Sequence, residues 1–247
     1  MEYKIAICSH DRIKTLKQKT LKVLDLYNIS RERIYIFVAP EELEDYRANL
    51  LGYNVIEGAL GLCANRNAVV NYFAEGTPVY FMDDDIRGYM EYTLDNQRHE
   101  RMLEDLDGFI CRGFREALKA DVSLWGLYPV ANGRWMKPEV VKGLVFCYGC
   151  SFGLFIRKDT LNTISFKEDY ERTILFYLRD KGVIRLNWVA PLQSYCKGKG
   201  GLNTERTLDK EKAECENLTQ QYPGYLTMSF NRGKWNLRFK KQKATDE

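Results

Sequence analysis

The feature that most constrains the fold is an uncharged run at residues 78–82 (PVYFM) that ends abruptly in Asp83, Asp84 and Asp85. β-Branched and aromatic residues without charge are typical of a strand buried on both faces of a sheet. Other strand-like runs alternate with helical patterns, at residues 4–8, 33–39 and 54–57. This alternation predicts an α/β fold with a mixed, mostly parallel central sheet, in which ligands bind beyond the carboxyl ends of the strands. We therefore expect the three acids at the ligand-binding edge.

The second half of the chain is less regular. We expect two short strands at residues 144–147 and 152–156, in an antiparallel or mixed arrangement because their connection is short. A helix is expected from residue 166 to 180, with Glu168 and Asp169 in its first turn, where the helix dipole favours negative charge. Helix capping alone would account for these two acids.

Composition narrows the class of protein. The 247 residues carry 37 basic and 34 acidic side chains, a net charge of +3 that excludes a histone-like polycation. Seven scattered cysteines without a signal-like start predict free thiols in the cytoplasm, and Cys147 and Cys150 are interpreted as core thiols. No apolar stretch has the length of a membrane span, so no membrane partner is expected.

The spacing of the acids indicates a cation site. Residues i and i+2 of a strand point to the same side, so Asp83 and Asp85 can face one ion while Asp84 turns elsewhere. Hard oxygen ligands favour Mg²⁺ or Mn²⁺, which take further ligands from substrate phosphates. The ordinary alternatives are an acidic turn and a calcium loop.

The run GLCANRNAVVNYFAEGTPVYFMDDD resembles the signature of glycosyltransferases of the A-type fold, with the acids in place of their DxD motif. CSHDR resembles the nucleotide-contacting loop of that fold, and KEDYERT resembles its xED segment. The ordered motifs over residues 3–202 are most similar to the TET-associated glycosyltransferases, a largely phage family that includes relatives of the base-J glucosyltransferase. That family is understood to place sugars on 5-hydroxymethylpyrimidines in DNA. A capsid-glycan glycosyltransferase of large viruses is a more distant likeness.

The resemblance implies roles for individual residues. Asp169 is the expected catalytic base, with Glu168 beside it contacting the acceptor or the sugar. The metal ligands would be Asp83 and Asp85. The donor, expected to be a UDP-sugar such as UDP-glucose, would be contacted by Ser9, Asp11, Arg12, Asn65, Arg66, Asp83, Asp84, Lys197 and Lys199. The expected setting is the cytoplasm of a phage-infected bacterium.

The C-terminal segment is basic and aromatic. We expect a catalytic domain over residues 1–228 and an extension over residues 229–247, which contains FNRGKWNLRFKKQK. Such a segment can neutralise phosphates while its rings pack or stack, although a solvated basic terminus has the same composition. The residues expected to contact DNA are Arg232, Lys234, Trp235, Arg238, Lys240 and Lys241.

Three functions remain open from the sequence. The first is a metal-dependent glycosyltransferase acting on 5-hydroxymethylcytosine or 5-hydroxymethyluracil in DNA, and the second is the same chemistry on a glycan or capsid protein. The third is a metal-dependent nuclease or a nucleotide-binding module. A second acidic or histidine cluster, which a two-metal nuclease needs, is not evident in the sequence.

Overall fold

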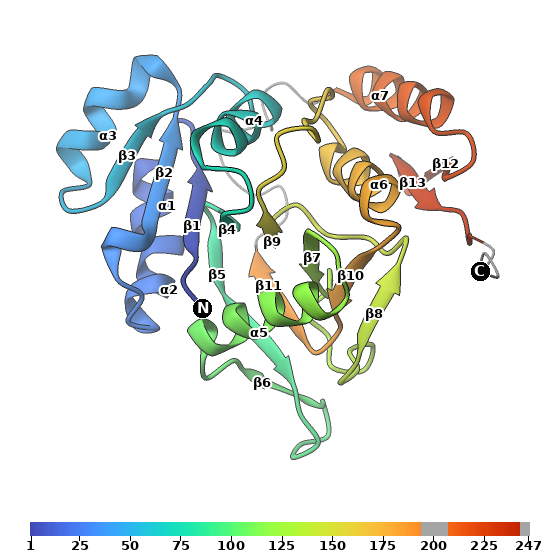
Figure 1. Cartoon of the computed structure of the whole chain (residues 1–247), viewed down its shortest axis with the longest axis horizontal. Helices are drawn as coiled ribbons and strands as arrows, with labels where there is room; N and C mark the ends of the chain where they lie inside the picture. Colours follow the sequence, from blue (N-terminus) through green and yellow to red (C-terminus); the bar gives the residue numbers. More distant parts are fainter. Residues whose placement is uncertain (194–206, 243–247) are drawn as a thin grey trace.

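A computed structural model describes residues 1–193 and 207–242 (Figure 1). The first half of the chain contains β1 (Lys4–Cys8), α1 (Ile13–Gln18), α2 (Thr20–Leu26), β2 (Ile34–Val38), α3 (Leu43–Asn49), β3 (Asn54–Glu57), α4 (Leu62–Tyr72), β4 (Pro78–Asp83), β5 (Ile86–Tyr92), β6 (Glu100–Met102) and α5 (Leu106–Lys119). The second half contains β7 (Leu124–Leu127), β8 (Val140–Gly143), β9 (Ser151–Phe155), α6 (Glu168–Asp180), β10 (Val183–Leu186), β11 (Val189–Gln193), α7 (Leu208–Gln221), β12 (Leu226–Asn231) and β13 (Lys234–Phe239).

The central sheet has eight strands in the order β3-β2-β1-β4-β9-β7-β10-β8. Six of them run in one direction, whereas β9 and β8 run against their neighbours. The chain is thus an α/β protein with a mixed, mostly parallel sheet, as the strand–helix alternation predicts. The expected strand at residues 144–147 is wrong, because the strand is β8, which pairs with β10 and not with β9.

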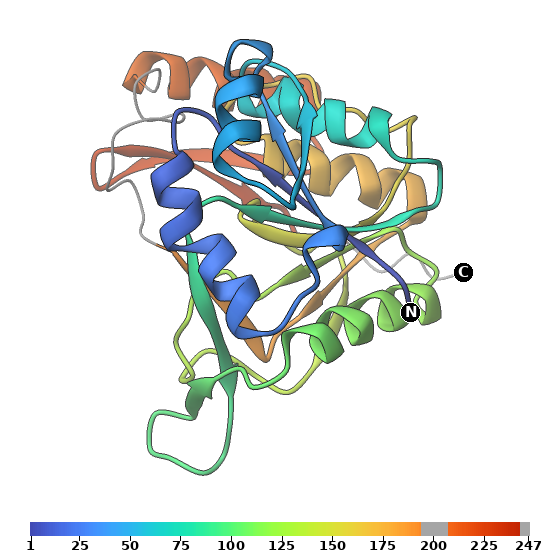
Figure 2. The same cartoon turned by 90° about the vertical axis from the view of Figure 1, so that its left-hand side faces the viewer.

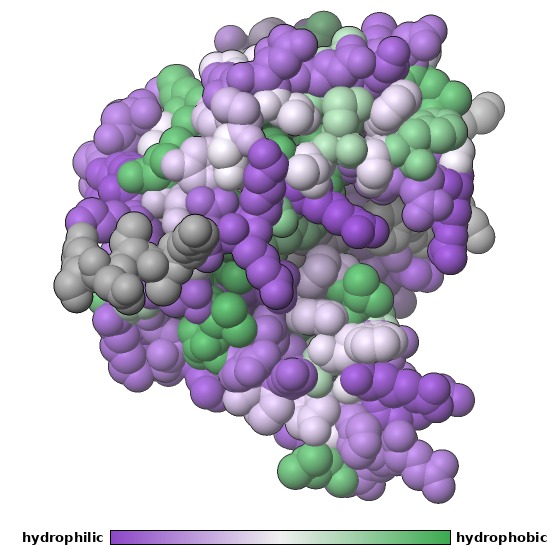
Figure 3. Space-filling model, turned by 90° about the vertical axis from the view of Figure 1, so that its right-hand side faces the viewer, coloured by the Kyte–Doolittle hydropathy of each residue, from purple (hydrophilic) through white to green (hydrophobic). Residues whose placement is uncertain are grey.

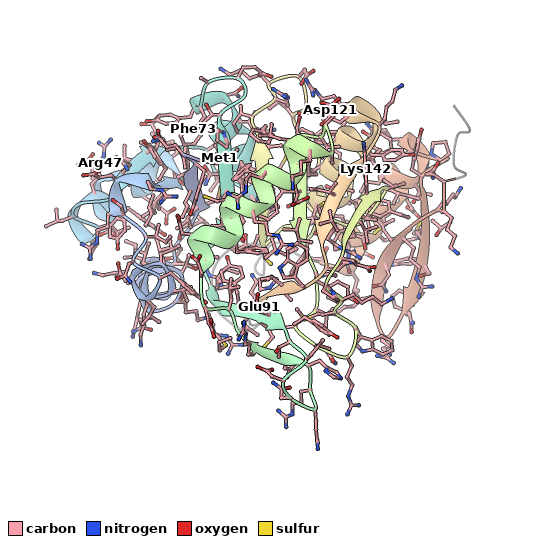
Figure 4. The ribbon with its side chains drawn as sticks, turned by 60° about the horizontal axis from the view of Figure 1, so that its bottom comes forward. Met1, Arg47, Phe73, Glu91, Asp121 and Lys142 are labelled. Atoms are coloured by element: carbon pink, nitrogen blue, oxygen red, sulfur yellow. The ribbon has the colours of Figure 1, made fainter. Side chains whose placement is uncertain are left out.

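The side chains of the strands alternate between two apolar layers. On one face Ile5 and Ile7 pack with α1, α2 and α5, and on the other Val79 and Phe81 pack with α4 and α6. Figure 2 shows these helices on opposite sides of the sheet. Figure 4 shows α5 lying along its face, with the labelled Asp121 just after the end of the helix. The result is three layers, with the core on both sides of β1 and β4.

Two smaller sheets lie beside the central one. Strands β11, β5 and β6 form the first, and the loop between β5 and β6 projects from the bottom of the molecule in Figure 1. Strands β12 and β13 form a hairpin that packs on α6 and α7 through a third apolar cluster. The expected boundary at residue 228 falls inside β12.

No helix within residues 1–193 and 207–242 is long and apolar enough to cross a bilayer. The predicted core thiols are both buried: Cys147 is 0% exposed and Cys150 1% exposed, and both are free.

Candidate functional site

The aspartates lie where the strand order reverses. From β1 the chain moves outward to β2 and β3 and then returns to the other side of β1 as β4. The segments after β1 and β4 leave neighbouring strands at the same edge of the sheet, and the elements they lead to, α2 and β5, pack against each other on one face. In open α/β sheets, ligands bind at such a topological switch point. The segment 9–12 follows β1 and the acids end β4, so both expected donor-binding segments meet at this edge.

The turn that carries the acids is held by Thr20. This side chain, 0% exposed, donates from Oγ1 to the carbonyl oxygen of Asp83 (2.8 Å) and accepts from the backbone N–H of Ile86 (3.0 Å). One hydroxyl thus satisfies the two backbone groups that flank Asp84 and Asp85. The Thr20 clamp sets where the chain leaves β4 and enters β5.

Asp83 and Asp85 converge on one atom. Gln193 Nε2 donates to Asp83 Oδ2 (3.0 Å) and to Asp85 Oδ1 (2.6 Å), and its Oε1 accepts from the hydroxyl of Tyr148 (3.2 Å). The two carboxylates therefore face one point, as expected, but the expected reason was wrong: β4 ends at Asp83, and Asp85 reaches this point through the turn that Thr20 holds, not through the two-residue period of a strand. Burial raises the pKa of Asp83; the nearby Arg66 opposes this rise, and Asp85 adds to it.

Asp84 turns away from this point. It accepts hydrogen bonds from Ser9 Oγ and Arg12 Nη1, each at 2.8 Å, and Ser9 Oγ is in turn 2.8 Å from the hydroxyl of Tyr46. Burial raises the pKa of Asp84 to about 7, although Arg12 and Ser9 favour its charged form. Arg12 Nη2 also lies 3.5 Å from Asp85 Oδ2. Ser9 and Arg12 thus anchor the acidic turn to the loop after β1.

Arg66 connects the strand end to the start of α6. Its guanidinium donates to Asp83 Oδ1 (2.9 Å), to the carbonyl oxygen of Gly149 (2.7 Å) and to Glu168 Oε1. A Cβ at position 149 would lie 3.0 Å from Glu168 Oε1 and 3.1 Å from Arg66 Nη1, so a larger residue there would require these two side chains to shift. Arg66 is only 7% exposed and so is not the surface residue that its polar helix sequence allows.

The two acids that begin α6 have different surroundings. Glu168 is 6% exposed and is paired with both Arg66 and Arg172, the latter at 3.5 Å. Arg172 stacks 3.8 Å above the ring of Phe152, and its burial, together with the nearby Arg66, lowers its pKa to about 9. Asp169 is half-buried, and its Oδ1 accepts from its neighbour's backbone N–H at 3.1 Å. Glu168 is thus held in place by two arginines, whereas Asp169 is partly exposed to solvent.

Several of the expected donor-binding residues lie apart from these contacts or outside the described chain. Asn65 is 4% exposed, and its amide bonds to the backbone of Phe37 (2.9 Å) and Ala59 (3.3 Å), so it joins β2 to the segment before α4. Asp11 is exposed, and its backbone N–H donates to Glu42 (2.6 Å). Lys197 and Lys199 lie outside the described residues.

Asp83 and Asp85 each place one carboxylate oxygen within 3.0 Å of Gln193 Nε2, so a divalent cation could take the place of this contact. Within the described residues, no group of three or more His, Cys, Asp or Glu side chains is arranged to hold a metal. A cation on Asp83 and Asp85 would therefore take its other ligands from water or substrate, as Mg²⁺ commonly does. The described site holds more acids than arginines: Asp83, Asp84, Asp85, Glu168 and Asp169 against Arg12, Arg66 and Arg172. This excess and the convergence of two oxygens suit Mg²⁺ or Mn²⁺.

The basic and aromatic residues of the C-terminal segment separate onto two faces of the hairpin. Trp235 shares a face with Phe230, its direct cross-strand partner, and Phe239 packs on Tyr170 of α6 with ring centroids 5.2 Å apart. Lys234 and Arg238 belong to the opposite, exposed face. The other expected DNA contacts are also exposed: Arg232 in the turn, and Lys240 and Lys241 after β13.

Several residues of the site have no clear signal in the sequence. Gln193 is the last residue of β11, a strand that no alternating sequence pattern predicts. Thr20 fits the spacing of the apolar face of a helix, so its sequence position indicates packing and not a hydrogen bond to the acidic turn. Arg172 lies one turn after Glu168, and this i, i+4 spacing of opposite charges could have indicated the pair.

No protein-family model and no curated protein matches the chain. Among solved structures, the bifunctional IspDF of Campylobacter jejuni aligns with 10% identity and a TM-score of 0.40, over 70% of this chain and 47% of that one. A mycobacterial protein aligns with 10% identity and a TM-score of 0.47, over 96% and 83% of the two chains. Mannose-1-phosphate geranyltransferase from Thermus thermophilus aligns with 14% identity and a TM-score of 0.32, over 76% and 56%. The chain thus spans about half the length of the first and third proteins. At these TM-scores the likenesses carry no argument about function.

Proposed function

We propose that this protein is a metal-dependent glycosyltransferase of the A-type fold that uses a nucleotide sugar, with DNA containing 5-hydroxymethylpyrimidine as the acceptor. The observation that carries the proposal is the arrangement around Arg66. The Arg66 guanidinium donates hydrogen bonds both to Asp83, one of the two proposed metal ligands, and to Glu168. Glu168 directly precedes Asp169, the proposed base. Arg66 therefore links the acids proposed to hold the metal and the diphosphate to the helix that carries the proposed base.

The donor side of the reaction depends on the crevice between the loops after β1 and β4. Asp83 and Asp85 would hold Mg²⁺ or Mn²⁺, which when bound supplies Lewis-acid neutralisation of a leaving diphosphate. Ser9 and Arg12 bind the Asp84 carboxylate, so it points away from the proposed metal position. Asp83 and Asp85 are then the two carboxylates of this turn that face the metal. Arg12 and Arg66 place fixed positive charge beside the acids, where negative charge develops on the leaving group.

Asp169 is the proposed base. In an inverting transfer the acceptor hydroxyl oxygen attacks the anomeric carbon, and the bond from this carbon to the diphosphate oxygen breaks with its electron pair. The hydroxyl proton passes to Asp169, whose carboxylate is exposed enough to meet an acceptor. Glu168, with its Oε1 held by two arginines, acts as a positioning residue that fixes the first turn of α6.

The acceptor assignment rests on the resemblance of the sequence and on the charge of the hairpin. Residues 226–242, which form β12, β13, their turn and the segment after them, contain five basic residues and no acidic one. A surface of this charge favours a polyanion over a neutral glycan. A glycan or capsid-protein acceptor remains the second outcome of the test below.

The decisive experiment is mass measurement of the nucleosides released from hydroxymethylated DNA after incubation with several sugar nucleotides and Mn²⁺. A hexose added to the 5-hydroxymethylpyrimidine supports the proposal. The Asp85→Asn variant should abolish the product, whereas Asp121→Asn should not, because Asp121 is an exposed acid that follows α5 (Figure 4). Hydrolysis of the donor without DNA modification would point to another acceptor. Strand nicking without a sugar nucleotide would identify a nuclease.

A further inference from the structure

The β12–β13 hairpin is a two-stranded ribbon with two unlike faces. Directly paired residues of antiparallel strands share a face. The inner face carries three apolar pairs: Leu226 with Phe239, Met228 with Leu237, and Phe230 with Trp235. The outer face carries three polar pairs: Thr227 with Arg238, Ser229 with Asn236, and Asn231 with Lys234.

The inner face holds the ribbon firmly against the catalytic unit. Leu226 is 0% exposed and Leu237 3% exposed, and both belong to an apolar cluster with α6 and α7. Two side chains at the start of α6 bond to the backbone of β13: Lys167 Nζ to the carbonyl oxygen of Trp235 (3.2 Å), and the Tyr170 hydroxyl to that of Leu237 (2.9 Å). The ribbon is thus bonded to the helical turn that carries Asp169.

The outer face is a polar, basic surface. Its side chains border an open groove of about 460 Å³ lined by Ser229, Asn231, Arg232, Lys234, Asn236, Leu237 and Arg238. Within residues 217–242 there is no acidic side chain to oppose the basic ones. The hairpin lies at the right of Figure 1, and Figure 3, which views the molecule from that side, is dominated by hydrophilic residues.

We propose that the β12–β13 ribbon binds double-stranded DNA by lying in its major groove. The major groove of B-DNA admits a two-stranded ribbon, and amide and hydroxyl groups such as those of Asn231 and Ser229 can pair with its base edges. Lys234 and Arg238, on the same face, would neutralise its phosphates. Single-strand binding relies on exposed aromatic platforms, whereas the outer face of the ribbon carries no aromatic side chain, and Phe230, which is 55% exposed, belongs to the inner face. The assignment rests on the proposed function for its acceptor, because the 5-substituent of a pyrimidine lies in the same groove.

Fluorescence anisotropy with a labelled hydroxymethylated duplex tests the ribbon without donor or metal, so it does not depend on transfer. We expect the duplex to bind more tightly than either of its single strands. Methyl green, which occupies the major groove, should displace the protein, whereas the minor-groove ligand netropsin should not. The variant Lys234→Gln/Arg238→Gln should flatten the slope of log affinity against log salt by about 1.8 and weaken binding about 60-fold at 0.1 M salt, if each side chain meets one phosphate.

The matched control is Lys22→Gln/Arg115→Gln, which removes one exposed lysine and one exposed arginine from α2 and α5. This control should leave the salt slope unchanged. Equal or tighter binding of single strands, displacement by netropsin alone, or an unaltered slope in the ribbon variant would overturn the proposal. Transfer to DNA with an unaltered slope would reject the ribbon and keep the enzyme. Ribbon-dependent duplex binding without transfer would keep the ribbon and reject the enzyme's proposed acceptor.

Discussion

The Thr20 clamp is the most specific structural support of the aspartate turn, and replacing Thr20 with valine should loosen it. Valine keeps the shape of threonine but removes the hydroxyl. The carbonyl oxygen of Asp83 and the backbone N–H of Ile86 would then lose their partner, next to a side chain that is 0% exposed. Because Asp83 and Asp85 flank this turn, their convergence on one point should loosen with it.

The expected cost follows from the two hydrogen bonds. An unpaired buried polar group costs about 1–3 kcal/mol, and the added methyl group recovers about 1 kcal/mol. For two unpaired groups the net loss should be about 1–5 kcal/mol in the free energy of unfolding. For a chain of this size, each kcal/mol lowers the melting temperature by about 2–4 °C.

Urea unfolding of the wild type, Thr20→Val and the control Thr20→Ser measures this loss. Serine keeps the hydroxyl and removes one methyl group, so its cost should be only about 1 kcal/mol. Calorimetry of nucleotide binding with Mn²⁺ should show a weaker affinity for the valine variant and little change for the serine variant. Equal stability of the two variants would refute the clamp.

Three further predictions concern the acids. Asp85→Asn, and less severely Asp83→Asn, should abolish the gain in nucleotide affinity on adding Mn²⁺ in calorimetry, and full activity in EDTA would contradict the metal role. Asp169→Asn should lower turnover by about 10²–10⁴-fold while keeping donor affinity, as expected for a lost base, and a calorimetric loss of donor binding would reassign it. Since burial raises the pKa of Asp84 from 3.8 to about 7, its contribution to the free energy of unfolding should be largest below pH 4, fall as the pH rises from about 4 to 7, and stay constant above that. Asp84→Asn should flatten this fall in urea unfolding from pH 5 to 8, and an unchanged pH profile would show that Asp84 is charged throughout.

The sequence predicts the fold best where one face of each element is buried. Residues 4–8, 54–57 and 78–82 are strands within one residue of expectation, because uncharged β-branched and aromatic runs have few other stable states. The single helix expected after β1 is divided at Lys19, whose backbone leaves the helical region (φ −120°, ψ −87°). Short strands such as β8, β10 and β11 were not predicted, since their pairing partners are far away in the sequence.

The closeness of Asp83 and Asp85 was expected from the two-residue period of a strand, but β4 ends at Asp83 and the turn held by Thr20 brings Asp85 beside it. The part played by Gln193 could not be predicted, because it meets Asp85 across 108 residues of chain and only through the pairing of β11 with β5. The different surroundings of Glu168 and Asp169 could not be predicted from the sequence either. They depend on which of two neighbouring carboxylates reaches Arg66 and Arg172.

The sequence by itself determined what depends on neighbouring residues: the buried strand before the acids and the basic charge of the C-terminal segment. Only the tertiary structure decided that the turn after β4 brings Asp85 beside Asp83, that Arg66 is buried between Asp83 and Glu168, and that the apolar face of the hairpin packs on α6 and α7. Periodicity is a property of neighbouring residues, whereas burial and ion pairing depend on which distant elements pack together, and this packing is set by the whole chain.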